Sequence, residues 1–227
     1  CVVISNFNNP LGSCLPDHKK KRLVKLLGEL DIPLIEVDIS GELHFEDPRP
    51  SVCKSYDDNG MVMLCSSFSK NLCPGYRVGW VVPGKYKSTI EWLKFTTNLA
   101  VAYLPQLAVA EYLESGGYQH HMRRIRRAYA LNVSRMIDGV ITHFPKTTRV
   151  TRPKGGFVLW VQMPENVDSL VLYKQALKAG ITLSPGYLFS PSQRFKNFIR
   201  LNAAYWSEEV ERAIVRLGDL IKAISKQ

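Results

Sequence analysis

The stretch SSFSKNLCPGYRVGW, residues 66–80, indicates the fold of the chain most directly. It follows a short, continuous apolar run, MVMLC at positions 61–65, which is typical of a strand buried on both faces of a parallel sheet. Ligands of such sheets bind beyond the carboxyl ends of the strands. The stretch therefore predicts a ligand site, and the side chains that could build it are two hydroxyls, an amine and a guanidinium: Ser67, Ser69, Lys70 and Arg77.

Short β-branched runs alternate with helical patterns on both sides of this stretch, which indicates βαβ units. We expect strands at 2–7, 33–39, 61–66, 77–82, 155–163 and 199–202, and helices at 17–30, 170–179 and 208–226. Residues 89–141 are expected to be mostly helical, with interruptions at Pro105 and at Gly116 with Gly117. The order predicts an α/β fold in three layers with a mostly parallel sheet, followed by a small α+β domain.

Three segments are expected along the chain. Residues 1–105 would form part of a large domain, 106–140 a connecting helix, and 141–227 the small C-terminal domain. The first apolar run begins at Cys1, so we expect a chain cut within its large domain. The histidines at 120 and 121 lie among arginines on the connecting helix, and solvent exposure is expected for both.

Composition excludes several classes of protein. A hydrophobic fraction of 45% and a charged fraction of 22% in 227 residues are those of a globular protein rather than a disordered or fibrous one. No run is apolar enough to cross a bilayer, so no membrane association is expected. The five cysteines form no CxxC pair, which favours reduced thiols, a cytoplasmic location and no metal site. The net charge of +10 favours weak attraction to anions and defines no nucleic-acid site.

Further polar residues follow the other predicted strands. Asn9 begins the segment Asn-Pro-Leu-Gly after the first strand, Asp38 ends the second, and Arg200 lies in the last, IRLN. Each residue taken alone is better explained by turn formation, a surface position or an ion pair than by a ligand site. Their combination in this order is what favours a ligand site.

These motifs together resemble the aspartate aminotransferase fold, fold type I of the pyridoxal-phosphate enzymes. The phrases NFNNPLG, ISGELHFEDPRP, LCSSFSK, PKGGFVLW and SPGYLFS are similar, more narrowly, to the MocR subfamily of GntR-type transcription regulators. In that subfamily an aminotransferase-like domain follows an N-terminal winged helix-turn-helix.

The resemblance implies a role for each candidate residue. Lys70 would be the catalytic residue, forming an imine with pyridoxal 5′-phosphate and exchanging it with an amine. Arg77, with Ser67 and Ser69, would hold the phosphate. Asn9 would hydrogen-bond the phenolic oxygen of the ring, and Arg200 would bind the carboxylate of an amino acid substrate.

One position departs from the family pattern. The family's second strand ends in EDDxY, whose first Asp contacts the pyridine nitrogen and whose Tyr contacts the phenolic oxygen, but here the residues are Val37 and Ser40. Asp38 is adjacent, and it is counted among the cofactor-binding candidates in case a bulge or an altered register turns it to the cofactor. Retention of transamination is therefore left undecided.

Two functions follow from the resemblance. The first is a pyridoxal-phosphate-binding effector domain of a MocR/GntR-type regulator, which takes an amino acid or amine by imine exchange at Lys70 and reaches DNA only through an N-terminal domain outside this chain. The alternative is a stand-alone pyridoxal-phosphate-dependent aminotransferase acting on amino acids. A homodimer is expected in either case.

Overall fold

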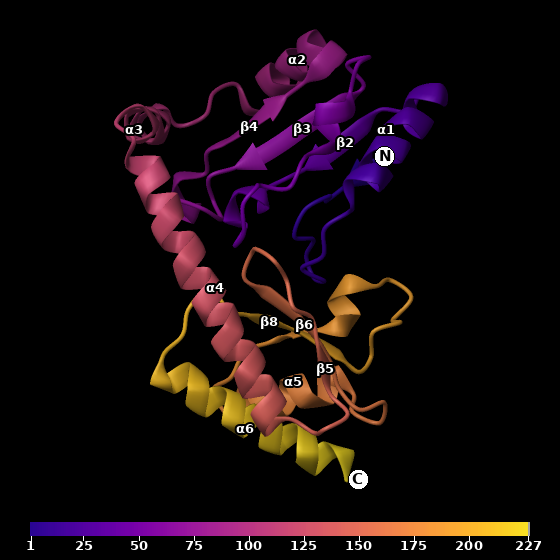
Figure 1. Cartoon of the computed structure of the whole chain (residues 1–227), viewed down its shortest axis with the longest axis vertical. Coiled ribbons are helices and arrows are strands. Elements are labelled where there is room, and N and C mark those ends of the chain that lie inside the picture. Colours follow the sequence, from indigo (N-terminus) through magenta and orange to yellow (C-terminus); the bar gives the residue numbers. More distant parts are fainter. Residues whose placement is uncertain (227) are drawn as a thin grey trace. The chain divides into compact units, whose positions relative to one another are not determined.

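The computed structural model describes residues 1–226, which form two compact units (Figure 1). Unit 1 comprises Cys1–Asn8 and Ser13–Arg126, and unit 2 comprises Asn9–Gly12 and Arg127–Gln227. The boundary between the two units falls between Arg126 and Arg127, inside a long helix. The segment ends expected from the sequence were residues 105 and 140.

Unit 1 is built on a four-stranded sheet with the order β1-β2-β3-β4. The strands are β1 (Val2–Val3), β2 (Leu34–Val37), β3 (Val62–Ser67) and β4 (Gly79–Val82). β1, β2 and β3 are parallel and β4 is antiparallel to β3, so the mostly parallel sheet predicted from the sequence is confirmed. Helix α1 (Asp17–Glu29) is the crossover between β1 and β2.

Side chains of β2 and β3 alternate between a covered and a partly open face of the sheet. Leu34 and Val62 lie on the covered face and pack with Leu27 of α1 and with Cys53. Ile35, the next residue along β2, lies on the other face and is 36% exposed. This alternation determines which polar side chains of β2 and β3 can contact a ligand on the open face.

Three helices follow the sheet: α2 (Lys87–Asn98), α3 (Tyr103–Glu114) and α4 (Gly117–His143). The single connecting helix expected over 106–140 is therefore wrong, because its first residues belong to α3. Gly116, which follows the end of α3, has a φ of +76°, a left-handed conformation that interrupts a helix and favours glycine.

Unit 2 carries an antiparallel sheet with the order β5-β6-β8-β7. Its elements are β5 (Arg149–Val150), β6 (Val158–Gln162), α5 (Ser169–Lys178), β7 (Ser184–Pro185), β8 (Phe198–Asn202) and α6 (Glu208–Ser225). Leu159 of β6 and Ile199 of β8 are fully buried, and they share this core with Leu172 of α5 and Ile221 of α6. The small α+β domain predicted from the sequence has this architecture.

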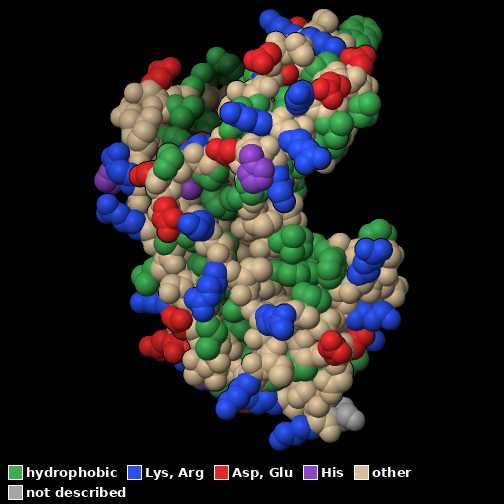
Figure 2. All heavy atoms as spheres, turned by 45° about the vertical axis from the view of Figure 1, so that its right-hand side comes forward, with side chains coloured by type: hydrophobic (Ala, Val, Ile, Leu, Met, Phe, Trp, Pro, Cys, Tyr) green, Lys and Arg blue, Asp and Glu red, His purple; other side chains and the backbone are tan. Residues whose placement is uncertain are grey.

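Five short 3-10 helices complete the chain: η1 (Gly41–Leu43), η2 (Cys53–Tyr56), η3 (Pro74–Tyr76), η4 (Gly84–Tyr86) and η5 (Gly186–Phe189). In residues 1–226, none of the helices is both long and apolar enough to span a membrane. Lys and Arg side chains are scattered over the face seen in Figure 2, with acidic side chains among them, so the net charge of +10 forms no continuous patch there.

Two helical glycines should respond oppositely to substitution by alanine. A Cβ on Gly28 in α1 would lie 4.0 Å from its nearest neighbour, whereas one on Gly218 in α6 would lie 2.5 Å from the carbonyl oxygen of His143. We expect Gly28→Ala to raise the free energy of unfolding by about 0.5 kcal/mol and Gly218→Ala to lower it by about 2 kcal/mol. Urea unfolding followed by circular dichroism measures both, and a stabilised Gly218→Ala variant would contradict the packing described here.

Candidate functional site

The turn after β3 presents Lys70 to solvent. The carbonyl oxygen of Phe68 accepts hydrogen bonds from the backbone N–H groups of Leu72, at 2.9 Å, and Cys73, at 3.0 Å, which closes the turn. Lys70 lies at its exposed crest, and its amine makes neither a hydrogen bond nor an ion pair with any part of residues 1–226. An unpaired amine of this kind is free to react with a carbonyl compound.

Two hydroxyls and a guanidinium gather beside this turn. Ser67 Oγ lies 3.0 Å from Ser69 Oγ, and Arg77 Nη1 lies 3.4 Å from the same Ser69 oxygen. Arg77 is exposed, and it has no carboxylate partner within the described chain. Hydroxyls and an unpaired guanidinium are the donors that a phosphate group requires.

The backbone at Arg77 is unusual. Its φ of +54° lies in the left-handed region, which few residues other than glycine adopt. The residue directly follows η3 and leads into β4. Non-glycine residues held in this region concentrate at functional sites, which agrees with the donor set around Arg77.

Asp38 is buried in a hydrogen-bonded ion pair. One carboxylate oxygen accepts a hydrogen bond of 3.1 Å from Asn6 Nδ2, and the other accepts one from the guanidinium of Arg49. Burial raises the pKa of Asp38, while Arg49 and Asn6 act in the opposite direction. Both oxygens of the Asp38 carboxylate are therefore engaged by protein groups.

The register of the sheet places Val37 and Asp38 on opposite faces. Val37 pairs with Cys65, and Asp38 N–H continues the ladder by donating to Cys65 O at 2.9 Å. The ladder thus contains neither the bulge nor the shift that Asp38 would need to face the other way. Asp38 lies on the same face as the buried Glu36, and the open face at this point carries Val37.

Helix α4 holds the turn that carries Lys70. Nε2 of His121 lies 2.8 Å from the carbonyl oxygen of Asn71, the residue after Lys70. The ring of Tyr118 packs edge-on against that of Phe68, with centroids 5.9 Å apart. The expectation that His121 is solvated is therefore wrong, since the helix turns this side chain inward.

The same helix also binds the segment after β2. Arg126 Nε donates to the carbonyl oxygen of Glu42 at 2.7 Å, and Arg126 Nη2 donates to Glu42 Oε2 at 3.2 Å. Glu42 in turn accepts a hydrogen bond of 2.6 Å from Arg49, the partner of Asp38. One half of α4 thus fixes both chain segments that leave the sheet at β2 and β3.

In unit 2, Asn9 and Arg200 lie in contact although they are 191 residues apart. Arg200 Nη1 donates to Asn9 Oδ1, and Arg200 Nη2 donates to Ser184 Oγ, both at 3.0 Å. The guanidinium carbon lies 5.4 Å from the ring centre of Phe189. Within residues 1–226, Arg200 Nε is buried and has no partner, and burial lowers the pKa of this guanidinium.

Gly12 allows the segment Asn9–Gly12 to pack closely against Pro153 in unit 2. Its φ is +70°, and a Cβ at this position would lie 2.9 Å from Cβ of Pro153. A side chain would be strained and crowded at once, so the last residue of Asn-Pro-Leu-Gly must be glycine. This close approach supports the placement of Asn9 beside Arg200.

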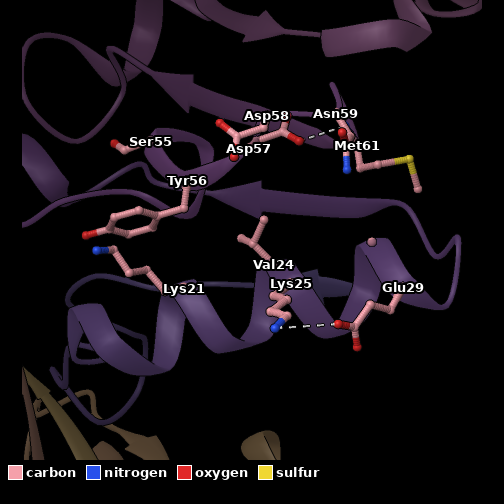
Figure 3. A pocket seen from close by; sticks show the side chains of 11 residues that line it. Lys21, Val24, Lys25, Glu29, Ser55, Tyr56, Asp57, Asp58, Asn59 and Met61 are labelled. Carbon is pink, nitrogen blue, oxygen red and sulfur yellow. Dashed lines mark hydrogen bonds and ion pairs between the residues drawn. The ribbon is translucent and has the colours of Figure 1, made fainter.

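A separate surface pocket of unit 1 contains none of the predicted site residues (Figure 3). It lies between α1 and the segment after η2. Its two lysines are engaged within the pocket: the Lys21 amine lies 5.2 Å from the ring centre of Tyr56, and Lys25 pairs with Glu29. These contacts are those of a solvated surface and indicate no chemistry.

The predicted residues thus form two groups, each within one unit. Ser67, Ser69, Lys70 and Arg77 belong to unit 1, and Asn9 and Arg200 belong to unit 2. The donor set of the first group fits the phosphate and aldehyde of pyridoxal phosphate, and the orphaned donor of the second fits a carboxylate. Sequence reasoning missed His121, whose only signal was its helical spacing from Tyr118.

Comparison with known proteins agrees with this arrangement. Residues 1–217 match the family defined as aminotransferase class I and II. The HTH-type transcriptional regulators YjiR and YdcR of Escherichia coli (strain K12) are 38% and 37% identical, over 97% and 98% of this chain and 47% and 48% of their own. The chain spans about half the length of the curated relatives it matches.

Solved structures agree as well. The crystal structure of the kynurenine aminotransferase of Pyrococcus horikoshii, in complex with PMP, is 30% identical, with a TM-score of 0.91 over 98% of this chain and 55% of that one. The predicted fold class and the resemblance to MocR-type regulators over the aminotransferase region are confirmed.

Replacing Asp38 tests its structural role. Asp38→Ala removes a buried carboxylate from Arg49, which keeps Glu42 as a second partner and is partly exposed. We therefore expect a loss of about 2 kcal/mol in the free energy of unfolding, less than for a fully buried pair. Urea unfolding gives the value, with Asp58→Ala, an exposed aspartate, as the control. Equal stability of the two variants would rule out a structural ion pair at Asp38.

Proposed function

The chain belongs to the aminotransferase class I and II family, and on that premise we propose that it is the pyridoxal-phosphate-binding effector domain of a MocR/GntR-type transcription regulator. The observation that carries the proposal is the unpaired amine of Lys70 beside Ser67, Ser69 and the unpaired guanidinium of Arg77. The two regulators matched over nearly the whole chain support the regulatory half of the proposal.

Each residue of unit 1 has a defined task toward the cofactor. When bound, pyridoxal phosphate supplies an aldehyde that condenses with amines and a ring that accepts electron density. Lys70 provides the amine that holds the aldehyde, and after exchange this amine is available to accept a proton. Arg77 would hold the phosphate by charge-assisted hydrogen bonds, and the hydroxyls of Ser67 and Ser69 would supply further hydrogen bonds to it.

Arg200 selects the ligand of the domain. A guanidinium with a buried, unpartnered Nε has a donor to spare for a carboxylate, and Asn9 and Ser184 hold its other nitrogens in place. A planar fork of this kind matches the two oxygens of a carboxylate. The ligand is therefore an amino acid, or another amine whose carboxylate lies at a similar distance from its amino group.

A sensor is favoured over an enzyme by the groups around Val37. Val37 offers no hydrogen bond, and Asp38 is engaged by Arg49 and Asn6 on the opposite face. The ring nitrogen of the cofactor then lacks the carboxylate that would strengthen electron withdrawal from the substrate. Imine exchange at Lys70 does not need this withdrawal, whereas efficient transamination does.

The alternative is a stand-alone pyridoxal-phosphate-dependent aminotransferase acting on amino acids. The 30% identity to the kynurenine aminotransferase of Pyrococcus horikoshii supports it. That identity is lower than the 38% shared with the regulator YjiR, which is why we place the regulator first.

The remaining assignments follow from the regulator proposal. DNA binding belongs to an N-terminal domain outside this chain, and the protein acts in the cytoplasm, where the five free cysteines stay reduced. The molecule is a homodimer. Large apolar side chains on α2 and α3 support this assignment, because Trp92, Phe95 and Leu104 are each more than half exposed.

Lys70→Ala tests the cofactor site. We expect the wild-type chain to develop the visible absorbance of lysine-bound pyridoxal phosphate, and borohydride to fix the cofactor on the peptide that contains Lys70. The variant should lose both signals, whereas Lys94→Ala, an exposed lysine on α2, should keep them. Equal labelling of Lys70 and Lys94 in the wild type would refute a specific site.

Val37→Asp tests the choice between sensor and enzyme. A carboxylate on the open face of β2 should raise transamination of a set of amino acids by at least about ten-fold, equal to about 1.4 kcal/mol of transition-state stabilisation. Val37→Asn controls for polarity without charge. If the wild type already catalyses many turnovers and Val37→Asp adds nothing, the effector proposal is wrong and the aminotransferase alternative holds.

A further inference from the structure

One face of α4 is turned toward the site segment of unit 1. Its members are Tyr118, His121, Met122, Ile125 and Arg126, spaced three, one, three and one residues apart. This spacing places all five on one side of a helix. Met122 is 2% exposed, so the face is packed against the unit rather than solvated.

His121 binds the backbone next to Lys70. A carbonyl oxygen can only accept, so His121 Nε2 carries the proton and donates to Asn71 O across 2.8 Å. Asn71 is itself buried, at 3% exposure, so the carbonyl that receives this bond is not available to bulk water. The bond therefore ties the chain at the position immediately after the reactive lysine.

Aromatic rings lie near the imidazole and near Phe68. The rings of Tyr112 and His121 lie 6.4 Å apart, and Tyr112 packs so closely on Gly117 that a Cβ there would lie 2.4 Å from its ring. Tyr118 meets Phe68, two residues before Lys70, and burial raises the pKa of Tyr118 to about 12, so its ring is neutral. Contacts from α4 thus bracket Lys70 on both sides along the chain.

We propose that His121 is a positioning residue, which fixes the Lys70 turn through its hydrogen bond to Asn71 and so presets the amine for the cofactor. The inference rests on the proposed function, because it assigns His121 a task in cofactor attachment at Lys70. Among the described residues His121 makes no hydrogen bond to Lys70, and it acts through the backbone of Asn71. Nothing else on α4 donates to this turn in the described chain.

The test compares three variants by amide hydrogen exchange in the cofactor-free chain. His121→Phe keeps a ring against Tyr112 but has no donor, whereas His121→Gln keeps an N–H donor at similar reach. His120→Phe changes the neighbouring exposed histidine and is the matched control. Exchange at Leu72 and Cys73, whose N–H groups close the turn, reports whether the turn is held.

We expect His121→Phe to exchange about five-fold faster at these two amides, as the loss of one hydrogen bond implies. His121→Gln and His120→Phe should match the wild type. The dissociation constant for pyridoxal phosphate should rise about five-fold in His121→Phe alone. Thermal unfolding checks that each variant folds, and His121→Leu replaces His121→Phe if the larger ring does not fit.

Two results would overturn the inference: unchanged exchange in a folded His121→Phe, or faster exchange with unchanged cofactor affinity, which would make the contact merely structural. Failure of His121→Gln to restore slow exchange would also overturn it. If the wild-type chain forms no lysine-bound cofactor, the proposed function fails, while the exchange measurement still decides whether His121 holds the turn.

Discussion

The regular pairing of β2 with β3 is the constraint on which the site depends. Because the two strands run in unbroken register, Glu36 and Asp38 must lie on the face covered by α1, and Val37 must lie on the other. Burial of the Asp38 carboxylate costs free energy, and the hydrogen bonds from Arg49 and Asn6 offset this cost. A one-residue shift would exchange the two faces and give the chain a different chemistry.

Helix α4 fixes the loops that follow the strands of this sheet. Each of the segments after β2 and β3 is bound by a polar side chain of α4: Arg126 contacts Glu42, and His121 contacts Asn71. Hydrogen bonds to backbone carbonyls are directional, so they set the position of a loop more closely than apolar packing does. Helix α4 therefore fixes the position of both loops.

Local patterns were sufficient to predict β1, β2, β3, β4, β6 and β8, the crossover helix, and the grouping of Ser67, Ser69 and Arg77, because those features lie within a few residues of each other. The strands β5 and β7 were not predicted, because two residues are too few to show a pattern. The contact between Asn9 and Arg200 joins residues 191 positions apart, and only resemblance to a family could suggest it. His121 was misjudged because a helix rich in arginine has the pattern of a solvated face, and the inward turn of one histidine depends on what packs against it. The interruption expected at Gly116 and Gly117 coincides with the break between α3 and α4, although the connecting helix was expected to run across it from 106 to 140.

The left-handed backbone at Arg77 has an evolutionary consequence. Glycine would adopt this φ without strain, and arginine costs on the order of 1 kcal/mol more at such a position. Selection for stability alone would therefore drive the position toward glycine. The presence of arginine there means that this chain carries a conformational penalty, and a lineage that no longer bound the anionic ligand proposed above would be expected to lose this arginine first.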